Sequence, residues 1–235
     1  MVKKGTMVGT DKDGFIREIF HRRISNKITK VLLKTNFNPL AATTVSFILG
    51  LIVAILFLLG DYIFLVIGAV VIQISYIFDC VDGELARTDK KRSTRFGVWY
   101  DDVSDRIKNV VILSGLAIGY FLKTQDPIIL ILLVIYISTS FIQNFSMLLG
   151  EKIFKKKPKS SYGQLTSSIA KKLNMKSQYI NYTGDLVVVL ISLGAILNMI
   201  QTLFIVLSVI QIIMILIIFY MNIKEKDNFL PYEEE

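Results

Sequence analysis

The chain has 235 residues and a net charge of +8; 53% of its residues are hydrophobic, 20% are charged, and the mean hydropathy is +0.55. This composition is too apolar for a soluble or intrinsically disordered chain and indicates an integral membrane protein. A single cysteine excludes an internal disulfide framework and a cysteine-ligated zinc site, and a single histidine argues against a serine–histidine–aspartate hydrolase.

Residues 15–32 are predicted to form a basic amphipathic helix. Apolar side chains recur there at helical spacing, while five basic side chains occupy the other face. A helix of this kind lies on an anionic membrane surface or packs against the cytosolic face of its own protein, and the pattern allows both. We expect its histidine, His21, to be an interfacial surface residue.

Six apolar stretches follow, each long enough to cross the hydrocarbon layer. The predicted membrane-spanning helices are 40–59, 62–83, 97–122, 127–149, 182–198 and 201–223. The sequence therefore predicts an all-α membrane protein with six transmembrane helices in one domain, 39–224. This domain follows a cytoplasmic segment, 1–38, that carries the amphipathic interfacial helix, and it precedes an acidic cytoplasmic tail, 225–235.

The basic residues are distributed unevenly between the two sides of the predicted bundle. Twenty-four of them lie in the N-terminal segment, the second and fourth loops and the C-terminal tail, whereas the opposite loops hold only Lys123. Because cytoplasmic loops carry an excess of lysine and arginine, both termini are predicted to be cytoplasmic, in the cell membrane. The eight basic residues of the fourth loop are either a solvated face or part of a site for a phosphorylated acceptor.

Two predicted crossings carry acidic side chains near the cytoplasmic side. Asp79 and Asp82 are three residues apart and Asp101 and Asp105 are four apart, so each pair shares a helix face. Asp79 and Asp105 each lie 17 residues from the outer ends of helices that run in opposite directions, so we expect Asp79 to face Asp105. By the same count, Asp82 faces Asp101 about one turn nearer the cytosol.

Four neighbouring carboxylates repel one another unless cations lie among them. Hard divalent ions prefer carboxylate oxygens, and two such ions roughly 3.5–4 Å apart suit displacement at phosphorus. The alternative is a charge-paired network that includes Arg87, Arg106 and Lys108 and holds the two helices together. Asp102 is an additional carboxylate that would compete as a ligand.

The spacing of these acids resembles the signature of the CDP-alcohol phosphotransferase (CDP-alcohol phosphatidyltransferase) family. The residues that carry the resemblance are Asp79-x2-Asp82-Gly83-x2-Ala86-Arg87-x9-Gly97-x3-Asp101-x3-Asp105. Six crossings and a preceding amphipathic helix also fit the family's architecture. The segment from Pro39 to Thr43 is similar to the family's Pro-Asn-x-x-Thr, with Leu40 in place of the usual polar residue.

The resemblance implies a reaction in which the hydroxyl of an acceptor alcohol attacks the β-phosphorus of a CDP-linked alcohol and CMP leaves. It implies two divalent cations, Mg²⁺ or Mn²⁺, held by Asp79, Asp82, Asp101 and Asp105. It gives Asp105 the further role of accepting the proton of the attacking hydroxyl. It places the CDP site among these residues: Thr43, Gly83, Ala86, Arg87, Ser93 and Gly97.

The expected substrates are a CDP-linked lipid and a polar alcohol such as inositol phosphate or glycerol phosphate, in phospholipid synthesis. A second possibility within the family is a soluble donor such as CDP-inositol. Outside the family, the same acids would suit a divalent-cation transporter, although the outer halves of the helices are almost wholly apolar, or a structural protein. Gly115-x3-Gly119 permits close helix packing within the bundle or across a homodimer, which the family implies. We expect membrane lipids as partners and no nucleic acid.

Overall fold

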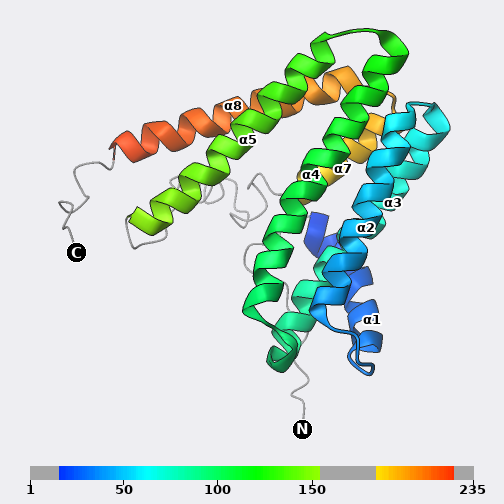
Figure 1. The fold of residues 1–235 in the computed structure, drawn as a ribbon, viewed down its shortest axis with the longest axis vertical. Helices are drawn as coiled ribbons and strands as arrows, with labels where there is room; N and C mark the ends of the chain where they lie inside the picture. The colour runs from blue at the N-terminus through cyan, green and yellow to red at the C-terminus, as the bar shows by residue number, and fades with distance from the viewer. Residues whose placement is uncertain (1–15, 154–183, 225–235) are drawn as a thin grey trace. The chain divides into compact units, whose positions relative to one another are not determined.

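The computed structural model describes residues 16–153 and 184–224, and this part of the chain contains helices and no strand (Figure 1). In chain order the elements are the π-helical turn η1 (Arg17–His21), α1 (Arg22–Leu32), α2 (Pro39–Leu59), α3 (Tyr62–Thr88), the 3-10 turn η2 (Lys90–Arg92), α4 (Arg95–Thr124), α5 (Ile128–Ile153), α7 (Gly184–Ile196) and α8 (Ile200–Lys224). The predicted fourth loop lies largely outside the described residues, as do the acidic tail and the first part of the N-terminal segment.

Among the described residues, five helices are long and apolar enough to cross a membrane: α2, α3, α4, and the segments Ile128–Ser146 and Ile200–Tyr220 of α5 and α8. The sequence predicted six. The remaining one, α7, has 13 residues in the part of the chain described, fewer than the roughly 20 that a crossing requires. The structure thus supports five membrane-length helices and one shorter apolar helix.

The chain forms two compact units. Of the described residues, the first comprises 16–130 and 184–203, and it contains η1, α1 to α4 and α7. The second contains most of α5 and α8, which pack on each other. In that second unit the Gln211 side chain donates to the Gln143 oxygen at 2.5 Å, and the Ser208 hydroxyl donates to the Leu132 carbonyl at 3.2 Å.

Helices α2, α3 and α4 lie side by side in the first unit, with α1 and α7 packed against α3 (Figure 1). The predicted Gly115-x3-Gly119 pair serves this packing, because a Cβ at either glycine would overlap a carbonyl oxygen of α2. Local signals set the helix boundaries. Asn38 caps α2 by accepting from the Ala41 amide at 2.8 Å, and Thr94 caps α4 by accepting from the Gly97 amide at 2.9 Å.

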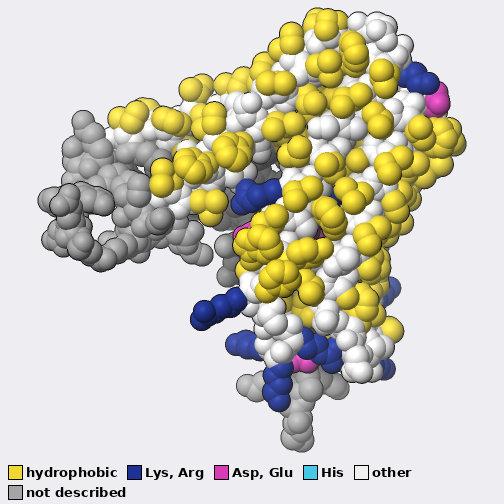
Figure 2. All heavy atoms as spheres, viewed as in Figure 1, with side chains coloured by type: hydrophobic (Ala, Val, Ile, Leu, Met, Phe, Trp, Pro, Cys, Tyr) yellow, Lys and Arg dark blue, Asp and Glu magenta, His cyan; other side chains and the backbone are white. Residues whose placement is uncertain are grey.

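Charged and apolar side chains separate along the first unit. Figure 2 shows lysine and arginine gathered at the end where α1 and the α3–α4 connection lie, whereas hydrophobic side chains cover much of α2 to α4. Exposed apolar surface of this extent suits contact with lipid, and a basic end suits contact with anionic headgroups.

The N-terminal helix corrects one expectation. His21 is fully buried, not a surface residue, and its Nε2 lies 2.8 Å from the Gln73 side-chain oxygen. The inward face of the helix is mixed: Ser25 and Thr29 are buried there with Ile28 and Leu32 packed beside them, whereas Phe20 and Val31 are exposed. An amphipathic pattern shows that a helix has two faces, but the partner decides which face is covered.

Candidate metal centre

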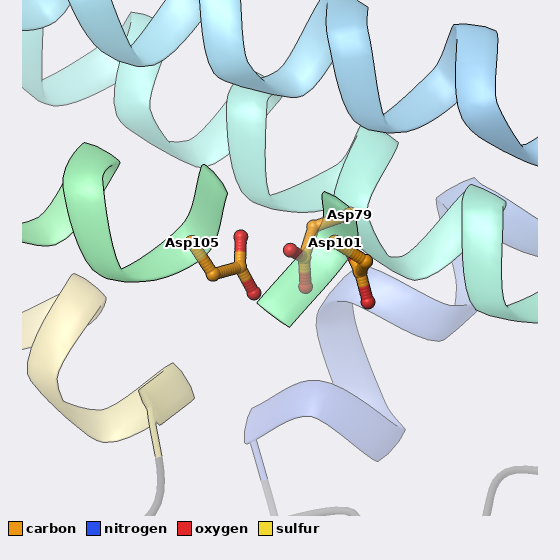
Figure 3. Close-up of side chains that lie close together, drawn as sticks. All are labelled: Asp79, Asp101 and Asp105. Atoms are coloured by element: carbon orange, nitrogen blue, oxygen red, sulfur yellow. The ribbon is translucent and has the colours of Figure 1, made fainter. Parts of the chain in front are cut away.

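A cluster of carboxylates lies between α3 and α4. Asp79, Asp101 and Asp105 each offer an oxygen, and these oxygens all lie within 4.8 Å of one another. Figure 3 shows the Asp105 carboxyl group pointing toward that of Asp79, with Asp101 beside it. Three carboxylate oxygens this close form a set that a hard divalent cation prefers.

Asp82 extends this cluster along α3. It lies three residues after Asp79 and outside the group of three acids whose oxygens converge. The count of residues along the two antiparallel helices predicted that Asp79 faces Asp105, and both belong to that group. The pairing of Asp82 with Asp101 stays a prediction. Asp82 is buried and accepts a hydrogen bond from the Thr43 hydroxyl at 2.8 Å.

The chemistry of the cluster fits a metal ion. Asp101 Oδ1 is buried, and within the described part of the chain it has no hydrogen-bond partner. A buried carboxylate oxygen without a donor is costly, and a cation would satisfy it. Asp102, the other candidate ligand on α4, is exposed and lies outside this group of three acids.

Two cationic side chains also reach Asp79. Lys108 Nζ lies 2.7 Å from Asp105 Oδ1, 3.4 Å from Asp79 Oδ1 and 2.9 Å from the Ser46 hydroxyl. Gly50 on α2 makes room for it, because a Cβ there would overlap the stem of the Lys108 side chain. Lys108 therefore forms ion pairs with the acids, as the alternative of a charge-paired network between the two helices expects of it.

Arg17 is the second cation, and no sequence signal singles it out beyond its place in a basic amphipathic segment. Its NH2 lies 3.2 Å from Asp79 Oδ2. Its Nε and NH2 both donate to the Tyr76 hydroxyl, at 3.0 and 2.6 Å. Its backbone amide donates to Asp185 at the beginning of α7. Arg17 thus links the N-terminal turn to two helices of the bundle.

Glu84 is a further residue that the sequence analysis missed. It lies within the signature, yet it faces away from the acid cluster and is buried against α1. Its carboxylate accepts from Arg22 at 2.8 Å, from Ser25 at 2.5 Å and from Thr29 at 2.7 Å. The spacing of these three donors along one face of α1 was the available signal.

The residues expected at the CDP site lie mainly around the end of α3 and the beginning of α4. The Arg87 guanidinium folds over Gly83, where a Cβ would be 2.9 Å from its NH1. Ala86 is in the same last turns of α3, and Ser93 is exposed in the α3–α4 connection. Gly97 lies in the first turn of α4, one turn before Asp101. Thr43, as described above, contacts Asp82.

These features define a class: a helical protein with five membrane-length helices in its described part, and with a cluster of acids on α3 and α4 that could hold a cation. A more specific assignment comes from comparison with known proteins. The model of the CDP-alcohol phosphatidyltransferase family matches residues 37–214, and the chain belongs to this family. The matched region includes the whole acid cluster.

Individual relatives are moderately similar. Over 219 residues, 92% of this chain, the sequence is 28% identical to a bifunctional IPC transferase and DIPP synthase from Aquifex aeolicus. The match covers 46% of the Aquifex protein, so this chain spans less than half of that relative's length. Over 93 residues, 40% of this chain and 47% of the relative, it is 30% identical to an archaetidylinositol phosphate synthase from Pyrococcus horikoshii.

The fold is also shared with a solved structure. The phosphatidylinositol phosphate synthase of Mycobacterium tuberculosis, crystallised with CDP-DAG bound, superposes with a TM-score of 0.50 at 22% identity. The match covers 81% of this chain and 92% of that chain. At this identity the comparison establishes a common fold.

Proposed function

We propose that this protein is a metal-dependent CDP-alcohol phosphotransferase of phospholipid synthesis. The observation that carries the proposal is the convergence of Asp79, Asp101 and Asp105 within 4.8 Å in a chain of this family. In the reaction, the acceptor oxygen bonds to the β-phosphorus of the CDP-linked donor. The bond from that phosphorus to CMP breaks, and CMP leaves.

In this proposal, Asp79, Asp82, Asp101 and Asp105 hold two divalent cations, Mg²⁺ or Mn²⁺. Bound there, the ions would offset negative charge on the diphosphate. Asp105 accepts the proton of the attacking hydroxyl. Its side chain is 44% exposed, against 11% for Asp79, so an alcohol from solution can reach it.

The CDP moiety is assigned to the end of α3 and the beginning of α4. Arg87 supplies a planar cationic group for a phosphate, Gly83 leaves room for that guanidinium, and Ala86 and Gly97 add little bulk where the nucleotide would approach. Ser93 adds a hydroxyl from the exposed connection. Thr43 has a positioning role through its hydrogen bond to Asp82, in addition to the nucleotide contact that the family pattern implies.

The proposed donor is a CDP-linked lipid, and the proposed acceptor is inositol phosphate or a similar polar alcohol. CDP-DAG in the mycobacterial structure supports the donor, and the name of the Pyrococcus relative supports the acceptor. The proposed membrane arrangement has α7 as a sixth crossing, both termini and the site in the cytoplasm, and α1 on the inner surface. The exposed Phe20 and Val31 support that placement of α1.

The test is CMP release by the purified protein in lipid vesicles with Mg²⁺ or Mn²⁺. CDP-diacylglycerol and CDP-inositol are offered in parallel, each with inositol phosphate or glycerol phosphate, and the products are identified by mass spectrometry. The proposal expects CMP and a phosphodiester product, with loss of both in Asp105→Asn. Metal uptake into sealed vesicles without CMP release from any pair of substrates would contradict it in favour of a transporter.

A further inference from the structure

Arg17 is one of two cationic side chains that contact the Asp79 carboxylate. Both oxygens of Asp79 have a cationic partner, Lys108 on Oδ1 at 3.4 Å and Arg17 on Oδ2 at 3.2 Å. A divalent ion bound by Asp79 must share or replace at least one of these partners, because a carboxylate oxygen close to a guanidinium is poorly placed to bind a second cation.

The two cations differ in how they are held. Lys108 belongs to α4, fits against Gly50, and donates to the Ser46 hydroxyl as well as to the acids, so it has a neutral partner beside the cluster. Arg17 comes from a separate element, the π-helical turn η1, and its side chain also donates to the Tyr76 hydroxyl. Single π-helical turns are rare and often lie at functional sites.

The rest of the N-terminal helix is anchored independently of Arg17. His21 binds Gln73, whose amide donates to Ser192 on α7 at 2.7 Å. One turn further, Arg22 and its neighbours on α1 bind Glu84. These contacts hold η1 beside the cluster, so the Arg17 side chain can change partner while the helix stays in place.

The charge balance indicates which new partner Arg17 takes. The four ionised acids carry four negative charges, and Arg17 and Lys108 offset two of them. Two divalent ions on the same acids would leave an excess of two positive charges. Each diester phosphate carries one negative charge, so the diphosphate of a CDP-linked lipid carries about two. The four acids, two divalent ions, the diphosphate, Arg17 and Lys108 together carry no net charge; Arg87, assigned above to the same donor, is outside this sum.

We propose that divalent ions displace Arg17 from Asp79 and that the released guanidinium then binds a phosphate of the CDP-linked donor. This inference rests on the proposed function. It makes Arg17 a substrate-binding residue that is held by a metal ligand until the metal arrives. Guanidinium groups form strong, paired hydrogen bonds with phosphate, so the exchange replaces one charge-assisted contact with another.

The first test is Mn²⁺ binding in the absence of donor, measured by electron paramagnetic resonance of free Mn²⁺. Arg17→Gln removes the competitor and is expected to bind Mn²⁺ at least about tenfold more tightly than wild type, the size of one charge-assisted contact. Tyr76→Phe removes the hydroxyl that holds the guanidinium and is expected to shift affinity in the same direction if Arg17→Gln fails to fold. Arg23→Gln is the matched control, because it removes the same charge from an exposed position of α1.

The second test is equilibrium binding of CDP-diacylglycerol at saturating Mn²⁺ without acceptor. Arg17→Gln is expected to bind the donor about tenfold more weakly, and Arg23→Gln as wild type does. An unchanged or weaker Mn²⁺ affinity in Arg17→Gln, or an equal gain in Arg23→Gln, overturns the inference. Failure of the proposed function would instead appear as no CMP release by wild type with any donor, whatever its affinity for Mn²⁺.

Discussion

Asp101 and Asp102 are adjacent in the chain but lie in different surroundings. Asp101 belongs to the acid cluster and has a buried oxygen without a donor, whereas Asp102 is exposed. On a helix, neighbours in sequence point about 100° apart, so only one of two consecutive acids can face α3. This pair therefore offers a matched comparison of an acid inside the cluster with one outside it.

We predict that Asp101→Asn weakens Mn²⁺ binding at least tenfold and lowers the rate of CMP release, whereas Asp102→Asn changes neither by more than about twofold. A metal bound to the native protein stabilises it by about 2.7 kcal/mol at a hundred times its dissociation constant. Wild type and Asp102→Asn should therefore melt at a higher temperature when Mn²⁺ is added, and after chelation the difference should disappear. Equal losses in both variants would place the metal elsewhere on α4.

His21 makes the N-terminal helix sensitive to acid. Burial lowers the pKa of His21 below its usual 6.5, and the hydrogen bond to Gln73 opposes this in part. The unfolded chain therefore binds a proton at a higher pH than the folded chain does, so stability falls as the pH drops below about 6.5. A buried Nδ1 without a hydrogen-bond partner among the described residues is consistent with a neutral ring.

The expected result is a melting temperature that declines between pH 6.5 and 5 in wild type and declines less in His21→Gln. Glutamine keeps a polar side chain toward Gln73 but does not titrate in this range. The comparison is made by thermal unfolding in one detergent at constant ionic strength. Parallel curves for the two proteins would mean that the pKa of His21 is not lowered in the folded state.

At the scale of elements, Glu84 fastens α1 to α3. Its ion pair with Arg22 is almost fully buried, with side-chain exposures of 3% and 6%. Breaking a buried ion pair from one side is costly because a charge remains without its partner in a medium of low polarity. Glu84→Gln is therefore predicted to lower the free energy of unfolding by about 3 kcal/mol and to speed amide hydrogen exchange along α1.

The control for this prediction is Asp89→Asn, which breaks the partly exposed pair between Asp89 and Arg92 at 2.9 Å. An exposed pair of this kind contributes at most about 1 kcal/mol, so the variant should unfold almost as wild type does. If Glu84→Gln also proves neutral, α1 is held by its apolar contacts, among them Ile28 and Leu32 against Leu85, and not by the buried carboxylate.

The periodicity of the apolar residues predicted the helices well, but it predicted less reliably which distant segments those helices contact. The helix boundaries of α2 follow from Asn38 and Gly60 in the sequence, and the facing of Asp79 and Asp105 follows from counting along two long helices. The burial of His21 and the position of Arg17 do not follow, because they depend on contacts between segments more than 50 residues apart. A local pattern contains no information on which distant side chain will cover it.

At the scale of the whole molecule, the distribution of basic residues predicts which loops face the cytoplasm. Lys27 lies on the exposed face of α1, and Lys123 lies at the other end of the helices, where it pairs with Asp61 at 2.6 Å. Because the native Cys80 is buried, the labelling of a single introduced cysteine can be measured without removing Cys80. In intact cells, a thiol reagent that cannot cross membranes is expected to label Lys123→Cys and not Lys27→Cys.

Permeabilised cells provide the control, since both cysteines should then react. Labelling of Lys27→Cys in intact cells would reverse the orientation and put the acid cluster near the outer surface.

The number of crossings is less predictable than their direction. The direction rests on charges summed over whole loops, so it does not depend on the length of any one helix. The number of crossings does depend on helix length, and the six-helix prediction was weakest at α7, which is short and follows residues outside those described.

The absence of a side chain at Gly50 has a consequence for the evolution of this protein. Any larger residue there would occupy the space through which Lys108 reaches the acids. The two positions are therefore expected to vary together: homologues with alanine or a larger residue at position 50 should have replaced the lysine at 108 by a shorter residue. A mutation at one position then becomes acceptable only after a change at the other, which restricts the order in which such lineages can diverge.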